Sequence, residues 1–306
     1  MGKSILVTGG AGFIGSHLVD ALVLAGHVVV VVDDLSVGKK MFLNKGARFS
    51  KKDIRSESMD ALFKKYQFDW VFHLAAHKSI RHSLEHPSYD ADINIMGSLN
   101  IIELAVKYGV ERLIFPSSAA VYGNCPTIPS HENINVYPIS PYGISKYSIE
   151  LYLNFLREHR GLCSAALRFS SVYGPRQDTS GDAGVIAVFV HKVIKGETPT
   201  VFGDGTQSRD FVFVGDIVRA AILAAESSYC GVVNVGTNHE ISLNMLLDSM
   251  RRASGKNFKV EYADWVPGEI RRSLLDNSLA QRVLGWAPEV SLDEGLRRTF
   301  EYFRAK

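Results

Sequence analysis

The spacing of three glycines near the N-terminus constrains the fold of this chain most. Gly9, Gly12 and Gly15 come directly after the short apolar segment Ser4–Thr8 and open the helical pattern Phe13–Ala25. At such a strand-to-helix turn the first glycine permits a tight turn and the second lets a pyrophosphate approach the backbone. The third lets the helix pack on the strand. The spacing therefore predicts a dinucleotide-binding unit.

The second predicted strand indicates which dinucleotide binds. Val28–Val32 consists of five consecutive valines, typical of a strand that is buried on both faces. Asp33 follows it, and there a carboxylate can accept a hydrogen bond from an adenosine ribose 2′-hydroxyl. Asp34 adds a negative charge that would repel a 2′-phosphate, so NAD is favoured. Lys39 and Lys40 leave NADP as the alternative.

Strand and helix patterns alternate through the first half of the chain. Further strands are predicted at Ala47–Lys51, Trp70–Leu74, Arg112–Pro116 and Ser164–Phe169, with helices at Ser58–Tyr66, Ala91–Tyr108 and Pro141–His159. This alternation predicts an α/β fold with a doubly wound parallel sheet, that is, a Rossmann fold.

The pattern becomes irregular after Gly174, where glycines and prolines are frequent. We expect an NAD-binding domain over residues 1–170, to which residues 211–235 return through strands at Phe211–Val214 and Val232–Val235. Residues 171–210 and 236–306 would form a smaller, discontinuous α/β domain that binds the substrate. Its helices are predicted within Val185–Lys195, Leu243–Ser254 and Leu292–Phe303, and another helix at Asp216–Ala225.

Charge and hydropathy exclude several classes of protein. Lys and Arg number 34 and Asp and Glu 32, a net charge of +2 that is too small for a nucleic-acid-binding surface. The longest aliphatic run, Val28–Val32, falls far short of the roughly 20 residues that cross a bilayer. No signal-peptide pattern precedes the glycines, so a cytoplasmic location is expected.

The cysteines and histidines do not indicate a metal site. Cys125, Cys163 and Cys230 are odd in number and lack a CxxC spacing, which favours reduced thiols over disulfides or zinc. Of the histidines at 73, 77, 82 and 86, the last two have the i, i+4 spacing that could bind a metal on a helix. The first, however, lies in a predicted strand and the second precedes a lysine rather than a carboxylate. We therefore expect no metal.

Several ordered motifs together resemble those of the extended short-chain dehydrogenase/reductase family, and within it the nucleotide-sugar 4-epimerases. They are Thr8–Gly15, His73–Ala76, Ser117–Gly123, Tyr142–Lys146, Gly203–Phe211 and Pro267–Arg272. They span nearly the whole chain. The resemblance implies the fold predicted above, an NAD cofactor and a UDP-hexose substrate.

Tyr142 and Lys146 are the main candidates for chemistry. They lie four residues apart on a predicted helix, so both side chains can reach one cavity. The resemblance implies that Tyr142 is the base, with its pKa lowered by the ammonium of Lys146 and the positive nicotinamide ring. It also implies that Lys146 holds the nicotinamide ribose and that Ser118 orients the sugar hydroxyl.

The resemblance also assigns binding residues. For the cofactor they are Gly9, Gly12, Phe13, Ile14, Gly15, Asp33, Asp34, Asp53, Ile54, Leu74, Ala75, Ala76, Asn94, Ser117, Tyr142 and Lys146. For the substrate they are Lys78, Ser118, Ser171, Val185, Arg209 and Arg271. The two arginines suit a diphosphate, because guanidinium groups match phosphate oxygens. Ser171 departs from the family, which commonly has Asn there.

Ala119 and Ala120 favour an epimerase over a dehydratase or a decarboxylase. Related dehydratases and decarboxylases carry an acidic residue directly after the catalytic Ser or Thr, and these alanines cannot transfer protons. We expect UDP-glucose/UDP-galactose 4-epimerisation by transient oxidation at C4, rotation of the 4-keto sugar and return of hydride. The alternatives are epimerisation of UDP-N-acetylhexosamine or UDP-glucuronate, and less so a dehydratase, a decarboxylase or a non-catalytic NAD sensor. A small residue, Ser273, where some relatives have a bulky one, would admit an N-acetyl group.

A homodimer is also implied by the resemblance. Many relatives pair the helices that correspond to Ala91–Tyr108 and Pro141–His159 in a four-helix bundle.

Overall fold

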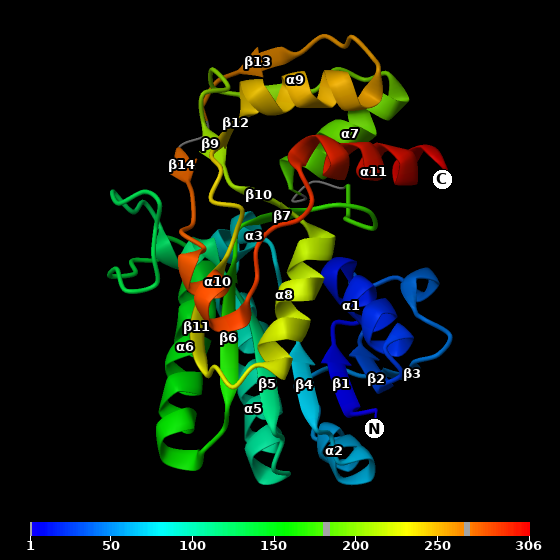
Figure 1. The fold of residues 1–306 in the computed structure, drawn as a ribbon, viewed down its shortest axis with the longest axis vertical. Coiled ribbons are helices and arrows are strands. Elements are labelled where there is room, and N and C mark those ends of the chain that lie inside the picture. The colour runs from blue at the N-terminus through cyan, green and yellow to red at the C-terminus, as the bar shows by residue number, and fades with distance from the viewer. Residues whose placement is uncertain (1, 180–183, 266–269) are drawn as a thin grey trace.

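A seven-stranded sheet lies at the centre of the larger part of the molecule (Figure 1). The structure, a computed structural model, describes residues 2–179, 184–265 and 270–306. Neighbouring strands of this sheet are all parallel. Their spatial order is β11 (Gly231–Val235), β6 (Ser164–Phe169), β5 (Arg112–Ser118), β4 (Trp70–His73), β1 (Ser4–Thr8), β2 (Val28–Asp33) and β3 (Arg48–Lys51). The predicted doubly wound parallel sheet is confirmed.

Helices cover both faces of the sheet. One face carries α1 (Phe13–Leu24), α8 (Val214–Glu226) and α10 (Ser278–Leu284). The other carries α2 (Met59–Tyr66), α5 (Ser98–Lys107) and α6 (Pro141–Arg160). The valines of β2 show why both layers are needed: Val29 and Val31 pack under α1, whereas Val30 and Val32 pack into the opposite core.

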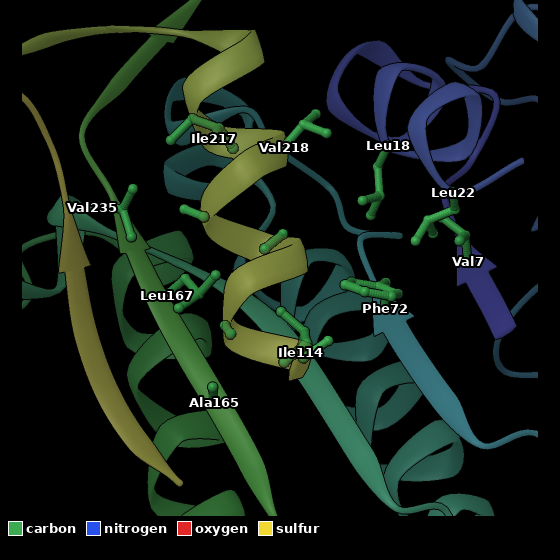
Figure 2. Packing of buried hydrophobic residues seen from close by; sticks show 14 of the residues in the cluster. Val7, Leu18, Leu22, Phe72, Ile114, Ala165, Leu167, Ile217, Val218 and Val235 are labelled. Atoms are coloured by element: carbon green, nitrogen blue, oxygen red, sulfur yellow. The ribbon is translucent and has the colours of Figure 1, made fainter. Parts of the chain in front are cut away.

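The core between α1, α8 and the sheet is built from alternate strand residues. Figure 2 shows Leu18 and Leu22 of α1 and Ile217 and Val218 of α8 above Phe72 of β4. All these side chains are buried. Each fully buried side chain of this size contributes roughly 1.5–3 kcal/mol to stability. This packing holds the carboxyl ends of the strands at one edge of the sheet.

Two short helices, α3 (Ile80–Glu85) and α4 (Pro87–Ala91), follow β4. The helix expected over Ala91–Tyr108 is not uniform, because a π-helical turn, Asp92–Gly97, joins α4 to α5. A 3₁₀ turn, Ala119–Tyr122, follows β5, and another, Lys40–Phe42, lies between β2 and β3.

The second half of the chain adds a smaller part beyond the carboxyl ends of the strands (Figure 1). Its apolar core joins α7 (Val185–Lys195), α9 (Leu243–Ser254) and α11 (Leu292–Arg304). Its short strands pair as β7 (Ser171–Tyr173) with β10 (Phe211–Phe213), β8 (Thr200–Phe202) with β13 (Glu261–Ala263), and β9 (Ser208–Arg209) with β12 (Ile241–Ser242) and β14 (Arg272–Ser273). The division into two domains stays a prediction.

One strand assignment is wrong. Val232–Val235 joins the central sheet as part of β11, but Phe211–Val214 does not. Its strand β10 pairs with β7, which lies beyond the end of β6. After β10 the chain continues through α8 to β11 of the central sheet. The apolar sequence of β10 showed that this strand is buried but not that it pairs with β7.

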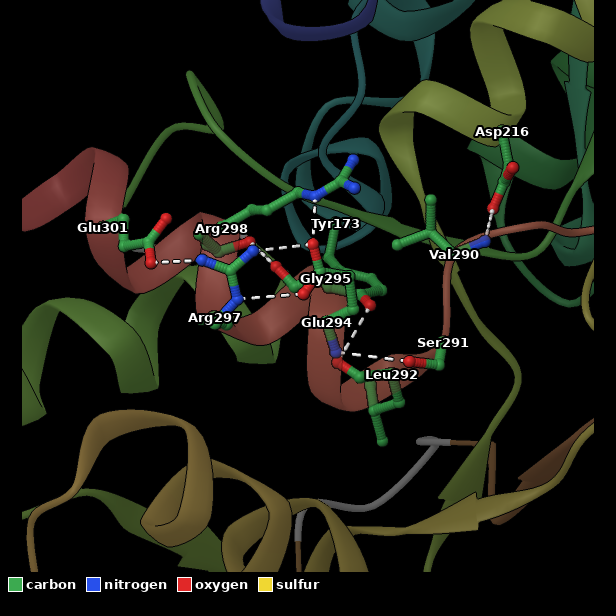
Figure 3. A network of polar contacts seen from close by, with 11 residues as sticks. Tyr173, Asp216, Val290, Ser291, Leu292, Glu294, Gly295, Arg297, Arg298 and Glu301 are labelled. Atoms are coloured by element: carbon green, nitrogen blue, oxygen red, sulfur yellow. Dashed lines mark hydrogen bonds and ion pairs between the residues drawn. The ribbon is translucent and has the colours of Figure 1, made fainter.

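Polar contacts connect the C-terminal helix to α8 (Figure 3). The carboxylate of Asp216 accepts hydrogen bonds from the backbone amides of Glu289 and Val290, both at 3.1 Å. Ser291 then caps α11 by accepting from the amide of Glu294 at 3.3 Å. Tyr173 donates to the carbonyl of Leu292. These bonds position α11 against β7 and β10.

The prediction of reduced thiols is wrong for two of the three cysteines. Cys163 and Cys230 form a disulfide, with their Cα atoms 5.4 Å apart, whereas Cys125 is free. Each directly precedes one of two adjacent parallel strands, β6 and β11, and Gly231 at the start of β11 pairs with Ala165 near the start of β6. An odd count without CxxC spacing could not reveal this neighbourhood. Among the described residues, each helix is too short or too polar to span a membrane.

Candidate active site

The glycine turn shapes the backbone at the end of β1. Gly9 has a left-handed φ of 69°, and a Cβ there would lie 2.7 Å from the amide nitrogen of Ala75. A Cβ on Gly15 would lie 2.2 Å from the carbonyl oxygen of Gly9, so the helix can approach the turn only without a side chain. A small cavity lies at the N-terminus of α1, lined by Gly12 and Phe13 among others. The first-turn amides have no helical partners, so this cradle fits the pyrophosphate of a dinucleotide.

Asp33 lies beside this turn. Its buried carboxylate accepts hydrogen bonds from the amides of Ala11 at 3.0 Å and Leu35 at 2.9 Å. Burial raises the pKa of this carboxyl group above its ordinary value. Asp34 is exposed and accepts from the amide of Ser36 at 2.9 Å. Asp33 is thus held rigidly at the place where the ribose of NAD is expected, and the site fits NAD.

Further cofactor candidates follow β3 and β4, which lie on either side of β1 and β2 in the sheet. Asp53 forms an ion pair with Arg55, 2.5 Å apart, and this hydrogen bond lowers the pKa of the Asp53 carboxyl group. Ile54 is buried against Gly97. Leu74, Ala75 and Ala76 follow β4, and the amide of Ala75 donates to Thr8 Oγ1 at 3.1 Å, directly before the glycine turn.

Asn94 holds the loop after β4, which carries Lys78, through two hydrogen bonds to the backbone of His77. Its Oδ1 accepts from the amide of His77 at 2.8 Å, and its Nδ2 donates to the carbonyl of His77 at 2.9 Å. The same Nδ2 donates to the buried carboxylate of Asp90, which also accepts from Ser145 Oγ at 2.6 Å. Sequence reasoning missed Asp90, which links this loop to α6.

The histidines after β4 contact one another as tilted ring pairs. The rings of His77 and His82 lie 4.7 Å apart between centroids, and those of His82 and His86 lie 4.5 Å apart. Over residues 2–179, 184–265 and 270–306, no three His, Cys, Asp or Glu side chains are grouped as metal ligands.

Ser118, Tyr142 and Lys146 come together where β5 ends and α6 begins. Ser140 caps α6 by accepting from the amide of Gly143 at 3.1 Å, and this sets the first turn that carries Tyr142. The side chains of Tyr142 and Ser118 are hydrogen-bonded. The Nζ atom of Lys146 lies 5.8 Å from the centre of the Tyr142 ring. A phenol, a hydroxyl and an ammonium thus share one site.

The expected lowering of the Tyr142 pKa depends in part on the positive nicotinamide ring and stays a prediction; without cofactor the direction is the opposite. Burial raises the pKa of Tyr142 to about 12, with a smaller raising effect from Asp90, although the hydrogen bond to Ser118 opposes this. Burial also lowers the pKa of Lys146 to about 8. A buried ammonium is itself disfavoured, so it cannot alone offset the cost of a buried phenolate.

Ser117 takes part in a different cluster. Its Oγ donates to Glu150 Oε1 at 2.5 Å, away from Ser118. Glu150 pairs with Arg168 at 2.6 Å, and both side chains are buried. Arg168 donates to the hydroxyl of Tyr122 at 2.8 Å. Sequence reasoning missed this buried pair, although Glu150 lies four residues beyond Lys146 on the same face of α6.

Arg209, Arg271 and Ser273 lie close together in the smaller part. Arg209 donates from Nη1 to the carbonyl of Arg271 at 3.4 Å, and Ser273 pairs with Arg209 between β14 and β9. The guanidinium of Arg271 lies 4.9 Å from the ring centre of Trp265. Ser171 pairs with Phe211, two residues beyond Arg209.

The other two substrate candidates, Lys78 and Val185, lie in different segments from the two arginines and from each other. Lys78 lies 3.7 Å from the carboxylate of Asp178, next to the glycine turn. Val185 begins α7 and packs against the apolar core of the smaller part. Pro267, Gly268 and Glu269 of the last motif lie outside the described residues.

The chain is similar to known proteins along nearly its whole length. The NAD dependent epimerase/dehydratase family matches residues 5–236. UDP-glucose 4-epimerase of Mycolicibacterium smegmatis is 41% identical over 308 residues, covering 98% of each chain. A structure of Thermotoga maritima UDP-glucose 4-epimerase with UDP-glucose has 45% identity and a TM-score of 0.96, covering 98% of each chain. UDP-N-acetylglucosamine 4-epimerase from Methanobrevibacter ruminantium, in complex with UDP-N-acetylmuramic acid, has 39% identity and a TM-score of 0.96, covering 99% of each chain.

Proposed function

Because this chain belongs to the NAD dependent epimerase/dehydratase family, we propose that it interconverts UDP-glucose and UDP-galactose by epimerisation at C4. The protein is an NAD-dependent UDP-sugar 4-epimerase. The observation that carries the proposal is the meeting of Ser118, Tyr142 and Lys146 where β5 ends and α6 begins, with Ala119 and Ala120 after Ser118. Simple redox chemistry at one carbon needs no further acid or base.

The side chains of Tyr142 and Ser118 carry out the proton transfer at the C4 hydroxyl. Tyr142 takes the proton of the C4 hydroxyl through its phenolic oxygen and later returns it, while Ser118 holds the hydroxyl oxygen in line. NAD, when bound, supplies the hydride acceptor at the sugar carbon and a positive charge beside Tyr142. Since burial raises the pKa of Tyr142 to about 12, positive charge near the phenol is essential for its ionisation near neutral pH.

Two arginines are proposed to hold the diphosphate of the substrate. Arg209 and Arg271 lie next to each other, and their guanidinium groups can bond to oxygens of both phosphates. A diphosphate tether held in this way leaves the sugar ring able to turn over between the two hydride transfers. Both epimers can then present C4 to the same tyrosine.

A second substrate is favoured by Ser273. This small residue stands opposite Arg209 in the β9–β14 pairing, so it lies next to a proposed diphosphate ligand. A similar structure belongs to a UDP-N-acetylglucosamine 4-epimerase. We therefore propose UDP-N-acetylglucosamine as an additional substrate.

We also propose that the chain forms a homodimer through α6 and the helical segment before it. Ile144, Leu151, Tyr152 and Phe155 form one exposed stripe on α6, each 44–54% exposed. Met96, 58% exposed, lies in the π-helical turn packed against α6. A second copy would cover both with the same surface. The cytoplasmic location expected from the sequence stays a prediction.

Incubation of the pure protein with UDP-glucose, UDP-galactose, UDP-N-acetylglucosamine and UDP-glucuronate tests the proposed reaction. Chromatography should show the C4 epimer of UDP-glucose, and mass spectrometry should show no change of mass. A product lighter by one water or one CO₂, formed as fast as any epimer, would instead indicate a dehydratase or a decarboxylase. Conversion of UDP-glucuronate alone would reject the proposed substrate.

A further inference from the structure

Arg176 reaches over the glycine turn from the other half of the molecule. It follows β7 and has a left-handed φ of 67°, which is uncommon for a residue other than glycine. Its Nη2 lies 2.7 Å from Asp20 Oδ2 on α1, and its guanidinium lies 5.8 Å from the ring centre of Phe42. His17 of α1 also donates to the carbonyl of Pro175, at 2.9 Å. The guanidinium is thus held at a fixed place.

One donor of this guanidinium has no partner in the protein. Nη1 of Arg176 is buried and makes no hydrogen bond with the described residues. A buried cationic N–H group without an acceptor is costly, and such groups are nearly always bonded in native proteins. The unmet donor therefore points to an acceptor that binds there.

The surroundings of Arg176 favour an anion. Arg176 lines the small cavity at the N-terminus of α1 together with Gly12, Phe13, Lys39 and Lys78. The backbone amides at a helix N-terminus add positive potential to that of the side chains. Asp178 also lines the cavity, and the nearby ammonium of Lys78, 3.7 Å away, offsets its charge.

We propose that Arg176 is a cofactor-binding residue whose Nη1 bonds to the diphosphate of NAD. This inference rests on the proposed use of NAD. Both the cofactor and the UDP-sugar carry a diphosphate, and the position of the guanidinium against Gly12 and Phe13 favours that of the cofactor. Arg176 would then close the cofactor site from the substrate side and retain NAD through the two hydride transfers.

Calorimetric titration of the full-length protein, freed of nucleotide, tests the assignment. Arg176→Met should weaken NAD binding about ten- to a hundredfold, the range for one charge-assisted hydrogen bond. Adenosine, which lacks phosphate, should bind both proteins equally. UDP binding to the NAD-loaded protein should also be unchanged.

Two control variants distinguish a direct contact of Arg176 with NAD from an indirect effect of its ion pair or of losing a surface charge. Asp20→Asn removes the ion pair but keeps the guanidinium, and should change NAD affinity less than threefold. Arg219→Met removes a similarly exposed arginine, 29% against 24%, that pairs with Glu289, and should leave NAD affinity unchanged.

Three results would overturn the inference. They are unchanged NAD affinity in Arg176→Met, weaker UDP binding without weaker NAD binding, and an equal loss of NAD affinity in Asp20→Asn. Failure of the wild-type protein to bind NAD at all would instead overturn the proposed function. Circular dichroism of each variant establishes that it is folded.

Discussion

Lys146 donates a hydrogen bond from Nζ to the backbone carbonyl of Pro116, with 2.8 Å between nitrogen and oxygen. Pro116 lies two residues before Ser118 on β5, so this bond ties the helix of the proposed base to the strand of its orienting hydroxyl. The same Nζ lies 4.6 Å from the ring centre of Phe115. The ammonium therefore has a close acceptor in a buried setting, where burial outweighs the charges of Asp90 and Glu150.

This setting predicts how stability changes with pH. Burial lowers the pKa of Lys146 to about 8, whereas an unfolded lysine titrates near 10.4. Between these values the unfolded chain binds more protons than the folded one, so stability rises with pH. The cost of the buried charge is complete below pH 8 and disappears as the pH approaches 10.4.

Urea unfolding without cofactor, at pH 7.5 and pH 9.5, measures this effect. From pH 7.5 to pH 9.5 the free energy of unfolding should rise by about 2 kcal/mol more for the wild-type protein than for Lys146→Met, because the variant lacks the group that titrates. Equal changes in the two proteins would show that Lys146 is not destabilised by burial.

Tyr142→Phe should abolish epimerisation while leaving the fold and NAD binding nearly intact, because only the phenolic oxygen is removed. A loss of roughly 4 kcal/mol in transition-state stabilisation corresponds to about a thousandfold in rate. Tyr66→Phe on α2 is the matched control and should keep full activity. If Tyr142→Phe retains more than a tenth of the wild-type rate, another group is the base.

Glu150→Gln should destabilise the protein by about 3–5 kcal/mol, since it leaves the buried guanidinium of Arg168 without its counter-charge. The double variant with Leu at 150 and Met at 168 removes both charges and should recover most of the loss. Urea unfolding of the three proteins measures the difference. A Gln variant as stable as wild type would mean that water or Ser117 compensates the charge.

The sequence could predict what depends on local patterns. Five valines in Val28–Val32 indicated a strand buried on both faces, and β2 is such a strand. The spacing of Tyr142 and Lys146 indicated one shared helix face, and both side chains lie there. These features depend on residues that are close in the chain, so periodicity was enough.

Long-range contacts could not be predicted in this way. The Glu150–Arg168 pair joins a helix to the strand it packs on, and the Cys163–Cys230 disulfide joins two strands that are neighbours only in the folded sheet. The burial that raises the pKa of Tyr142 without cofactor could not be predicted from spacing either, because it depends on what packs around the phenol. No spacing rule contains that information.

Reduction of the Cys163–Cys230 disulfide should lower the stability by up to about 4 kcal/mol, because the bond closes a loop across a sequence separation of 67 residues. Urea unfolding with and without a thiol reductant measures the loss. Cys163→Ser should be less stable and insensitive to the reductant, whereas Cys125→Ser should respond like wild type. No effect of the reductant on wild type would show that the thiols are free in solution.

Ser273→Tyr should depress turnover of UDP-N-acetylglucosamine while sparing UDP-glucose. Ser273 stands opposite Arg209, so a large ring there would enter the space next to the proposed diphosphate site, where an acetamido group needs room. Loss of one well-packed contact or a modest clash changes binding by about 1–3 kcal/mol, or roughly 10–200-fold in specificity. The ratio of kcat/KM values for the two sugars measures this. Ser273→Ala, which keeps the side chain small, is the matched control and should leave that ratio unchanged. If Ser273→Tyr slows both sugars equally, or wild type does not convert the acetylated sugar, Ser273 does not line the pocket for the group at C2.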